Sequence, residues 1–460
     1  MPKIAVVSLG CAKNLVDTEI MLGQIIQAGW SLTQNFGEAE MILVNTCGFI
    51  KEAKTESLDS IMEMAEYKKP GRGVCSKLVV AGCLVQRYAQ DLAREIPEVD
   101  CWIGLDGVGM VMAQIEKAGT QKAQLLAEGL TNSAKNRGLK RPGGPFLNNE
   151  NLPRYQVTFP HTTYVKIAEG CDHRCSYCAI PLIKGGFQSR NPEAIVTEIS
   201  TLVKAGVKEI NLIAQDITRY GRDLNPPLNL KKLLEEIISR ANPDWLRLLY
   251  AYPTGIDCEL LEFIASQPSI CKYLDLPLQH INSRILKLMN RNESPAKLRE
   301  TLSLIRNQIP GISLRTTFLT GFPTETEPEF EEILALVAEG FFQHIGVFTY
   351  SAEEGTGSFA YVDDVPEKVK QERKRKILEA QRPISARKLA GLRGQKARVL
   401  IDKILTEGQA VGRTEKFAPE IDGVVYVSAL ESDKRGGLRA GQFIAGTVTG
   451  SDDYNLWVTI

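Results

Sequence analysis

Residues 169–181 read EGCDHRCSYCAIP, which places Cys171, Cys175 and Cys178 within eight residues of one another. A structural zinc site normally uses four nitrogen or sulfur ligands, so three cysteines either take a partner from elsewhere or leave one coordination position open. His173 lies inside the same stretch and is a candidate for the fourth ligand. The stretch therefore predicts a metal centre, and the rest of the sequence has to distinguish a closed site from an open one.

The composition is that of a globular protein with several domains. The chain has 460 residues, 43% hydrophobic and 24% charged, and its 55 basic residues balance its 55 acidic ones, so charge gives no steering toward nucleic acid or acidic lipid. The first residues, MPKIAVVSLG, are typical of a buried strand rather than a signal peptide, and no apolar run approaches a membrane span. We expect a cytoplasmic protein with no membrane partner, whose ten cysteines serve metal or redox chemistry.

Three apolar runs near the N-terminus each stop at a cysteine. KIAVVSLGC ends at Cys11, MILVNTC at Cys47 and KLVVAGC at Cys83, and helical patterns follow them. Strands that alternate with helices predict a parallel, doubly wound sheet, whose ligands bind beyond the carboxyl ends of the strands. We therefore expect the three cysteines to converge at one edge of this sheet.

The periodicity disappears between this region and the cysteine-rich stretch. Residues 116–156 are rich in Gly, Asn and Pro, which predicts a linker or loop at a domain boundary. The remaining cysteines follow no strand-end pattern, and we interpret them as small buried hydrophobic residues: Cys75, Cys101, Cys258 and Cys271.

After the linker, strand and helix alternate again. Six strand-like runs extend from TYVKIAEGC to HIGVFTYS, and they predict an open or complete β/α barrel with its chemistry at the carboxyl-terminal rim. The cysteine-rich stretch follows the first strand, so it lies on that rim. Residues 321–327, GFPTETE, are typical of a turn that caps a helix. The basic helix that follows the barrel is expected to break near Pro383 and to form a solvated connector.

The C-terminal region has a different character. Short alternating strands with Gly and Asp turns begin after Gly394 and predict a small β-barrel. Residues 393–460 carry nine basic and nine acidic residues, whereas a barrel that grips RNA phosphate is expected to be basic. Because all the strand-end and loop cysteines precede this barrel, we expect its removal to leave the metal centres intact.

The loop spacing is informative because a cubane iron–sulfur cluster normally needs four cysteine thiolates. Three ligands in C-x3-C-x2-C spacing leave one iron open. This spacing, its place after the first barrel strand and Tyr177 before the last cysteine resemble the radical S-adenosylmethionine (SAM) superfamily. The resemblance implies that SAM occupies the open iron, with Tyr177 beside it. His173 is then a loop residue, and a zinc site that uses His173 is the alternative.

Two cysteine trios followed by a small barrel resemble the radical SAM methylthiotransferases over nearly the whole chain. The resemblance implies an α/β fold with a flavodoxin-like parallel sheet domain at 1–115, a linker at 116–156, a radical SAM partial β/α barrel at 157–390 and a TRAM β-barrel at 393–460. It implies SAM and two [4Fe-4S] clusters as cofactors. The implied cluster ligands are Cys11, Cys47 and Cys83 for one cluster and Cys171, Cys175 and Cys178 for the other.

Within this family, SLGCAKNLVDTE and APEIDG resemble the branch called RimO, which adds a methylthio group to the β-carbon of an aspartate in ribosomal protein S12. The tRNA adenosine branch, MiaB, has Gln-Met where this chain has Ala12 and Lys13. The C-terminal barrel carries no net charge, which favours binding to a basic ribosomal protein over binding to the phosphates of RNA. Lys184 and Phe417 depart from the family pattern, which has arginine and aspartate there. One alternative is a tRNA methylthiotransferase. The other is a non-enzymatic protein that binds RNA or the ribosome and whose domains are stabilised by metal sites with four ligands each.

The resemblance also implies the reaction. A cluster reduced by a donor such as flavodoxin or ferredoxin passes an electron to SAM, and the resulting 5′-deoxyadenosyl radical abstracts a hydrogen atom from the substrate. A second SAM methylates a sulfur attached to the other cluster, and the substrate radical takes up the methylthio group. Polar residues at strand ends are the candidates for binding SAM, with Arg190 as a further residue near the ligand: Gln215, Gln279 and Arg315.

Overall fold

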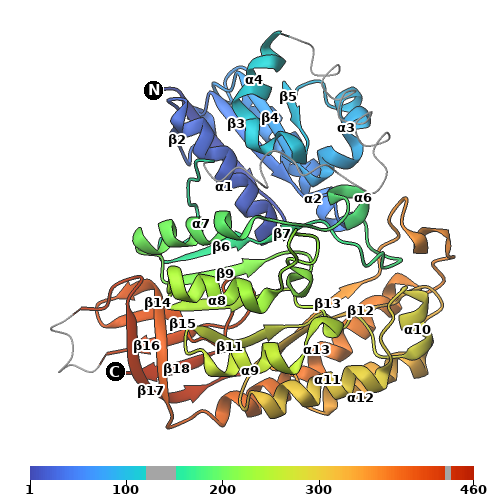
Figure 1. Ribbon diagram of the computed structural model, residues 1–460. Coiled ribbons are helices and arrows are strands. Elements are labelled where there is room, and N and C mark those ends of the chain that lie inside the picture. The colour runs from blue at the N-terminus through green and yellow to red at the C-terminus, as the bar shows by residue number, and fades with distance from the viewer. Residues whose placement is uncertain (121–151, 430–436) are drawn as a thin grey trace.

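The computed structural model describes residues 1–120, 152–429 and 437–460. An N-terminal unit and a C-terminal barrel lie against different sides of a larger central unit (Figure 1). Most of the predicted linker, residues 121–151, lies outside the described residues, and residues 116–120 belong to a helix rather than to a loop.

The N-terminal sheet has five parallel strands in the order β2-β1-β3-β4-β5. Separate apolar cores cover its two faces, which explains why the central strand β3 is buried at every position. The predicted parallel sheet is confirmed, and because β1, β3 and β4 are neighbours, their carboxyl ends meet. The elements are β1 (Lys3–Ser8), α1 (Ala12–Gln27), β2 (Ser31–Leu32), β3 (Met41–Thr46), α2 (Lys51–Ala65), β4 (Lys77–Gly82), α3 (Cys83–Glu95), β5 (Cys101–Ile103) and α4 (Val111–Thr120).

The central unit confirms the predicted partial barrel, with six parallel strands in the order β13-β12-β11-β10-β9-β6. A short antiparallel pair, β7 (Ala168–Glu169) and β8 (Gln188–Ser189), flanks the cysteine-rich loop. The strands are β6 (Thr162–Lys166), β9 (Glu209–Ile213), β10 (Trp245–Leu248), β11 (Ile270–Asp275), β12 (Ser313–Thr320) and β13 (His344–Thr349). The helices are α6 (Ile180–Lys184), α7 (Pro192–Lys204), α8 (Leu230–Arg240), α9 (Cys258–Ser266), α10 (Ser283–Leu288), α11 (Pro295–Gln308), α12 (Glu327–Ala338) and α13 (Glu367–Ala390).

The predicted break at Pro383 is wrong. Helix α13 continues through this proline, although proline removes a hydrogen bond from a helix interior. Tertiary packing offsets that loss, because Ile377 is fully buried and Gln381 Nε2 donates to the Phe342 carbonyl oxygen at 3.0 Å. The helix packs on α12 and β13, so it belongs to the central unit and is not a solvated connector.

Two smaller predictions have different outcomes. The capping role of GFPTETE is confirmed, because Thr326 and Glu329 form a capping box at the start of α12. The interpretation of the isolated cysteines is confirmed for three of them and wrong for Cys258, which is exposed at the first position of α9. The buried three are Cys75, Cys101 and Cys271.

The C-terminal unit is the predicted small barrel, closed in the order β14-β15-β16-β18-β17. The sequence patterns did not identify β15, which follows directly after a turn at Gly408 and contains a glycine itself. The strands are β14 (Lys396–Thr406), β15 (Gln409–Arg413), β16 (Val425–Ser428), β17 (Phe443–Ser451) and β18 (Leu456–Thr459).

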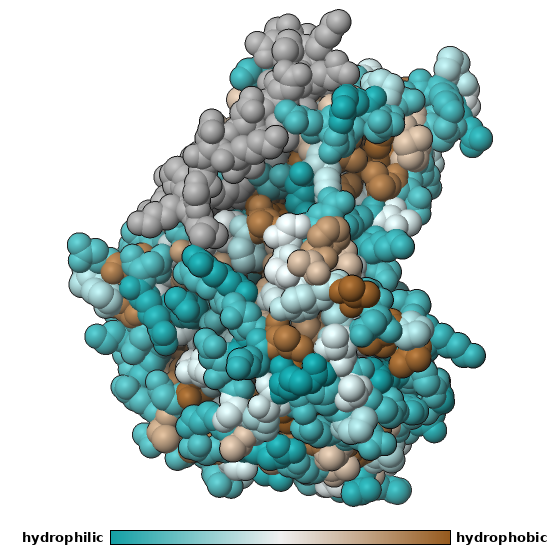
Figure 2. All heavy atoms as spheres, turned by 90° about the vertical axis from the view of Figure 1, so that its right-hand side faces the viewer, coloured by the Kyte–Doolittle hydropathy of each residue, from teal (hydrophilic) through white to brown (hydrophobic). Residues whose placement is uncertain are grey.

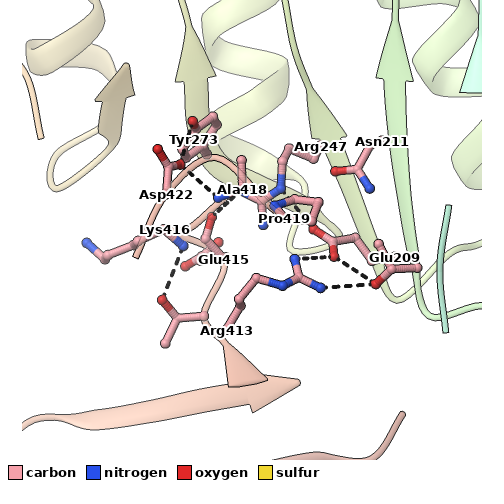
Figure 3. Close-up of polar contacts among 12 residues, drawn as sticks. Glu209, Asn211, Arg247, Tyr273, Arg413, Glu415, Lys416, Ala418, Pro419 and Asp422 are labelled. Carbon is pink, nitrogen blue, oxygen red and sulfur yellow. Dashed lines mark hydrogen bonds and ion pairs between the residues drawn. The ribbon is translucent and has the colours of Figure 1, made fainter. Parts of the chain in front are cut away.

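The segment that connects β15 to β16 closes the amino-terminal end of the central barrel (Figure 3). Glu209, the first residue of β9, accepts from Arg247 at 2.9 Å and from Arg413 at 2.5 Å, and all three side chains are buried. Burial alone would raise the pKa of Glu209, but Arg413 and Arg247 hold it below its ordinary value. Phe417 is fully buried against His344, which accounts for an apolar residue where an aspartate is usual.

The expectation that removing the C-terminal barrel leaves the metal centres intact stays a prediction, but this contact shows that the removal has a structural cost. Deleting it would leave Arg247 and Glu209 at an opened barrel end without Arg413. Breaking a buried ion pair in this way costs about 3–5 kcal/mol. The C-terminal barrel therefore contributes to the stability of the central unit.

Candidate active site

The first cysteine trio lies at the carboxyl edge of the N-terminal sheet. Cys11 is the N-cap of α1, Cys47 follows β3, and Cys83 is the first residue of α3. Burial raises the pKa of Cys47 and Cys83, the latter to about 12, and the nearby Cys11 raises both further. The structure thus brings the three strand-end cysteines together.

Cys11 differs electrostatically from its two neighbours. Burial pushes its pKa upward, but the ammonium groups of Lys13 and Lys184 help to hold the pKa of Cys11 below its ordinary value. A thiolate is the form of cysteine that binds a metal. Cys11 is therefore the member of the trio that most readily supplies a charged ligand.

Asn14 ties the three cysteine loops together, and the sequence patterns did not identify it. Its Nδ2 donates to the Leu9 carbonyl oxygen at 3.1 Å and to the Thr46 carbonyl oxygen at 2.8 Å. Cys83 Sγ donates to Asn14 Oδ1 at 3.5 Å. One buried amide thus contacts all three loops. The sequence offered one indication of this role, namely that Asn14 lies three residues after Cys11. Its partners at Thr46 and Cys83 are too distant in sequence to be predicted.

Glycines beside the cysteines permit the close approach of these loops. Gly10 and Gly82 have φ angles of +90° and +104°, which side chains rarely adopt. A Cβ at Gly10 would lie 2.9 Å from Cys47 Cβ, and one at Gly82 would lie 2.4 Å from Asn45 Oδ1. The loops therefore form a cradle that a larger residue would fill.

The second trio lies in one loop at the rim of the central barrel. The loop begins at Gly170, whose φ is +77° and where a Cβ would lie 2.0 Å from the Gly186 carbonyl oxygen. Ser176 anchors its middle, since its N–H donates to the Met289 carbonyl oxygen at 2.9 Å and its own carbonyl oxygen accepts from Ser358 N–H at 2.7 Å. Backbone contacts thus hold this loop in place.

His173 has partners that account for it as a loop residue. Its Nε2 lies 2.6 Å from Asp216 Oδ2, and its ring stacks on Tyr252 with centroids 3.7 Å apart. Both contacts join the loop to the ends of neighbouring barrel strands. This arrangement favours the interpretation of His173 as a structural residue over the alternative of a zinc ligand.

Tyr177 and Arg291 form a pair beside the second trio. Tyr177 is hydrogen bonded to Arg291. The pKa of Tyr177 lies well above its ordinary value, because the side chain is buried and because Cys175 and Cys178 lie nearby. Arg291 is buried and lies over the Tyr252 ring at 4.5 Å. The sequence patterns missed Arg291, because it follows α10 and approaches the loop only in three dimensions.

The strand-end candidates for binding SAM lie in different environments. Gln215 follows β9, and both atoms of its amide group are buried without a hydrogen-bond partner in the described part of the chain. Gln279 has a left-handed backbone with φ of 69° and bridges to Phe318. Arg315 does not lie at the carboxyl end of a strand as predicted, because it is the third residue of β12 and donates to Asp422 of the C-terminal barrel at 2.9 Å. Arg190 binds the Lys166 carbonyl oxygen and Glu198, each at 2.7 Å, and so has structural partners.

The two trios lie on opposite sides of one buried junction. Cys83 packs in the same apolar cluster as Ala179, which follows Cys178. Lys184 is 4% exposed, pairs with Glu169 and lies 4.0 Å from Asp17 of the N-terminal unit. A buried lysine with carboxylate partners thus occupies the position where the family has arginine.

The residues present fit the implied cofactors. Each trio offers three thiols, and within the described residues no three His, Cys, Asp or Glu side chains are close enough to share one metal ion. A cubane places its thiolates on different irons, so its ligands stand farther apart than those of a single ion. The unpartnered amide of Gln215 offers a donor and an acceptor to a polar cofactor at the rim.

Comparison with known families defines the class of protein. Residues 3–104 match the uncharacterized protein family UPF0004, residues 165–337 the radical SAM superfamily and residues 394–460 the TRAM domain. The fold of the radical SAM methyltransferase TsrM from Kitasatospora setae superposes with a TM-score of 0.54 at 15% identity, covering 78% of this chain and 74% of that one. This protein is therefore a radical SAM enzyme with an additional N-terminal sheet unit and a terminal TRAM barrel.

Similarity over the full length identifies the family. The chain is 43% identical over 456 residues to the ribosomal protein uS12 methylthiotransferases RimO of Syntrophotalea carbinolica and of Geobacter sulfurreducens. The alignments cover 99% of this chain and 96% and 97% of those two proteins. The chain belongs to the RimO family and is a radical SAM methylthiotransferase.

Proposed function

We propose that this enzyme transfers a methylthio group to the β-carbon of an aspartate in ribosomal protein S12. The observation that carries the proposal is the junction, where Cys83 of the first trio and Ala179 beside the second trio share one apolar cluster. The two trios therefore flank one contact between the N-terminal and central units, and we propose that the substrate carbon is held between them. The names of the relatives support ribosomal protein uS12 as the substrate.

We assign one [4Fe-4S] cluster to each trio. With SAM bound, these groups supply the electron, the hydrogen-abstracting radical and the sulfur that the reaction needs. Within the chain, Asn14 holds the loops of the first trio in one place. Tyr177 and Arg291 support the second loop, and Gln215 offers its free amide group to SAM.

The junction also has to exclude water, because a reactive carbon radical would otherwise be quenched. Tyr250 and Leu249 follow β10 and pack in an apolar cluster with Val16 of α1. This packing joins the N-terminal and central units at the rim. We propose that it shields the junction from water on the side that faces the C-terminal barrel.

A protein substrate needs an accessible approach to the junction. Hydrophobic side chains gather on the face shown in Figure 2, and several exposed apolar residues belong to the rim of the central unit. Leu182 of α6 is 51% exposed and Phe359 is 48% exposed, in segments that contact the second cysteine loop. Exposed apolar patches are typical of protein interaction sites. We propose that the substrate protein docks on this face.

Two further partners follow from the chemistry. A flavodoxin or ferredoxin is the proposed electron donor, and the cytoplasm, where ribosomal proteins are made, is the proposed location. No helix among the described residues has the length and apolar character needed to cross a membrane.

The test is a competition between the two candidate substrates of the family. The reconstituted enzyme is offered purified ribosomal protein S12 and unmodified tRNA side by side, and both are analysed by mass spectrometry. A methylthio mass increase on the aspartate-containing peptide is expected. Product on tRNA adenosine and none on the peptide would contradict the proposed substrate but not the radical chemistry.

A further inference from the structure

Lys13 is a buried cation at the junction to which the proposed function has assigned no role. It lies in the first turn of α1, two residues after Cys11, and is 6% exposed. Its Nζ reaches into the central unit, where it lies 3.3 Å from the centroid of the Tyr250 ring and donates to the Ala214 carbonyl oxygen at 3.4 Å. Both partners follow barrel strands at their carboxyl ends. The ammonium group therefore lies between the two units.

The other buried lysines at this junction have carboxylate partners. Lys166 Nζ lies 2.5 Å from Asp17 Oδ1, and Lys184 pairs with Glu169. In the part of the chain that the structure describes, Lys13 forms no such ion pair. An ammonium group has three donors, and a ring face with one long hydrogen bond satisfies only part of this capacity. Cys11 and Asp275 act on Lys13 electrostatically, but within the described residues neither carboxylate nor thiolate forms an ion pair with it, so the buried ammonium group lacks a carboxylate partner of its own.

Asp275 is the carboxylate at this rim that faces Lys13, and it is engaged elsewhere. Its Oδ2 accepts from the Tyr250 N–H at 3.1 Å, whereas its Oδ1 lies 3.8 Å from Arg315 Nε and has no hydrogen-bond partner among the described residues. These contacts hold Tyr250 in a left-handed conformation with φ of 65°. Asp275 thus positions the ring beneath Lys13, and within the described residues it forms no ion pair with the ammonium group at contact distance.

We propose that Lys13 binds the side-chain carboxylate of the substrate aspartate. This inference rests on the proposed function and deepens it by naming the specificity-determining residue. The β-carbon of an aspartate is bonded directly to its carboxylate carbon. A carboxylate held by Lys13 therefore places that carbon close to Cys11, on the side of the first trio.

The same contact accounts for discrimination between similar side chains. An asparagine lacks the charge that Lys13 requires, and a glutamate has one more carbon between its β-carbon and the carboxylate. The Tyr250 ring covers one side of the ammonium group, so the carboxylate approaches from the opposite side. Lys13 therefore acts as a substrate-binding residue, and Tyr250 as a positioning residue.

The test uses the full chain with both clusters reconstituted and two synthetic S12 peptides, one with aspartate and one with asparagine at the target position. Peptide affinity is measured without oxygen for the unmodified enzyme, Lys13→Met and Lys13→Arg. Lys3→Met is the matched control, because Lys3 lies at the amino end of β1 in an exposed ion pair. Iron content and 5′-deoxyadenosine formation are measured for every variant.

The unmodified enzyme is expected to bind the aspartate peptide about 30-fold or more tightly than the asparagine peptide, as for a buried charge contact. Lys13→Met should reduce this ratio to near one while 5′-deoxyadenosine formation, which depends on the second trio, persists. Iron content should also persist, because Lys184 still lies beside the first trio. Lys13→Arg should keep part of the preference for the aspartate peptide, because it retains the positive charge. Lys3→Met should keep the full preference.

Two outcomes would overturn the inference. A Lys13→Met variant that keeps the full preference for aspartate would show that the ammonium group does not contact the carboxylate. A variant that loses iron instead would show that Lys13 supports the first cluster. If the unmodified enzyme neither binds nor modifies the aspartate peptide, the proposed function itself fails, and this result is visible before any variant is compared.

Discussion

The two cysteine trios reach the same junction by different routes. The second trio occupies eight consecutive residues of one loop, whereas the first is collected from the ends of three strands of one sheet. The second loop is held mainly by backbone hydrogen bonds, such as Ser176 N–H to the Met289 carbonyl oxygen. The first trio is held by side chains from other elements, such as Ser57 at the Cys47 backbone, and Asn14 contacts all three of its loops.

This difference indicates that the two trios differ in how strongly substitutions of surrounding residues disturb them. A local loop keeps its ligands close even when one tether is lost, because few residues separate them. Ligands from separate strands stay together only while the tertiary structure holds their loops. The first trio should therefore respond to single substitutions at residues that are not ligands, and the second much less.

The largest effect is expected from replacing Cys171, Cys175 and Cys178 together by Ala. The variant should lose formation of 5′-deoxyadenosine completely, because no thiolate remains to hold the cluster that opens to SAM. Anaerobically purified protein should fall from about eight irons to about four. Liquid chromatography of the nucleoside product and an iron assay give the measurement. Continued SAM cleavage would show that these cysteines do not hold the reducing cluster.

Replacing Cys11, Cys47 and Cys83 together by Ala should separate the two roles. Iron should again fall to about four, and 5′-deoxyadenosine should still form, because the second loop is independent of these ligands. Methylthiolated peptide should disappear in the mass spectrum. Persistence of that product would make the first trio structural and the proposed division of roles wrong.

Asn14→Ala tests the side chain that contacts all three loops of the first trio. Loss of its buried hydrogen bonds should lower the free energy of unfolding by about 1–3 kcal/mol, measured by chemical denaturation. Iron content and methylthiolation should fall toward the values of the first triple variant, while SAM cleavage persists. Asn35→Ala is the matched control, since Asn35 caps a short helix at an exposed position of the same unit and does not contact the trio. Equal effects of the two substitutions on iron would contradict the role of Asn14.

His173→Ala should have the smallest effect. Its contacts with Asp216 and Tyr252 are lost, which is expected to cost about 1–2 kcal/mol, but the backbone bonds of the loop remain. The second cluster and SAM cleavage should be retained, as judged by the visible absorption of the cluster and by product formation. Complete loss of this cluster would identify His173 as a ligand and revive the alternative that the structure disfavours.

The sequence patterns predicted the parts of the fold that depend on local periodicity. Runs that end at Cys11, Cys47 and Cys83 have the apolar, β-branched character of buried parallel strands, and their alternation with helices determines a parallel sheet. Pro383 shows the limit of this reasoning. A proline has the same local cost in any helix, but whether neighbouring elements offset that cost depends on packing that is distant in sequence.

By itself, the sequence determined the residue types that can hold iron and their spacing, because three thiols within eight residues can be brought together by the conformation of one short loop. Only the tertiary structure decided which residues surround them. Asn14, Arg291 and Lys13 meet partners up to 201 residues away, and nothing in their local sequence indicates those contacts. The tertiary structure also decided the partners of the buried lysines, because Lys166 meets Asp17 across the junction, Lys184 meets Glu169 of its own unit, and Lys13 meets an aromatic ring.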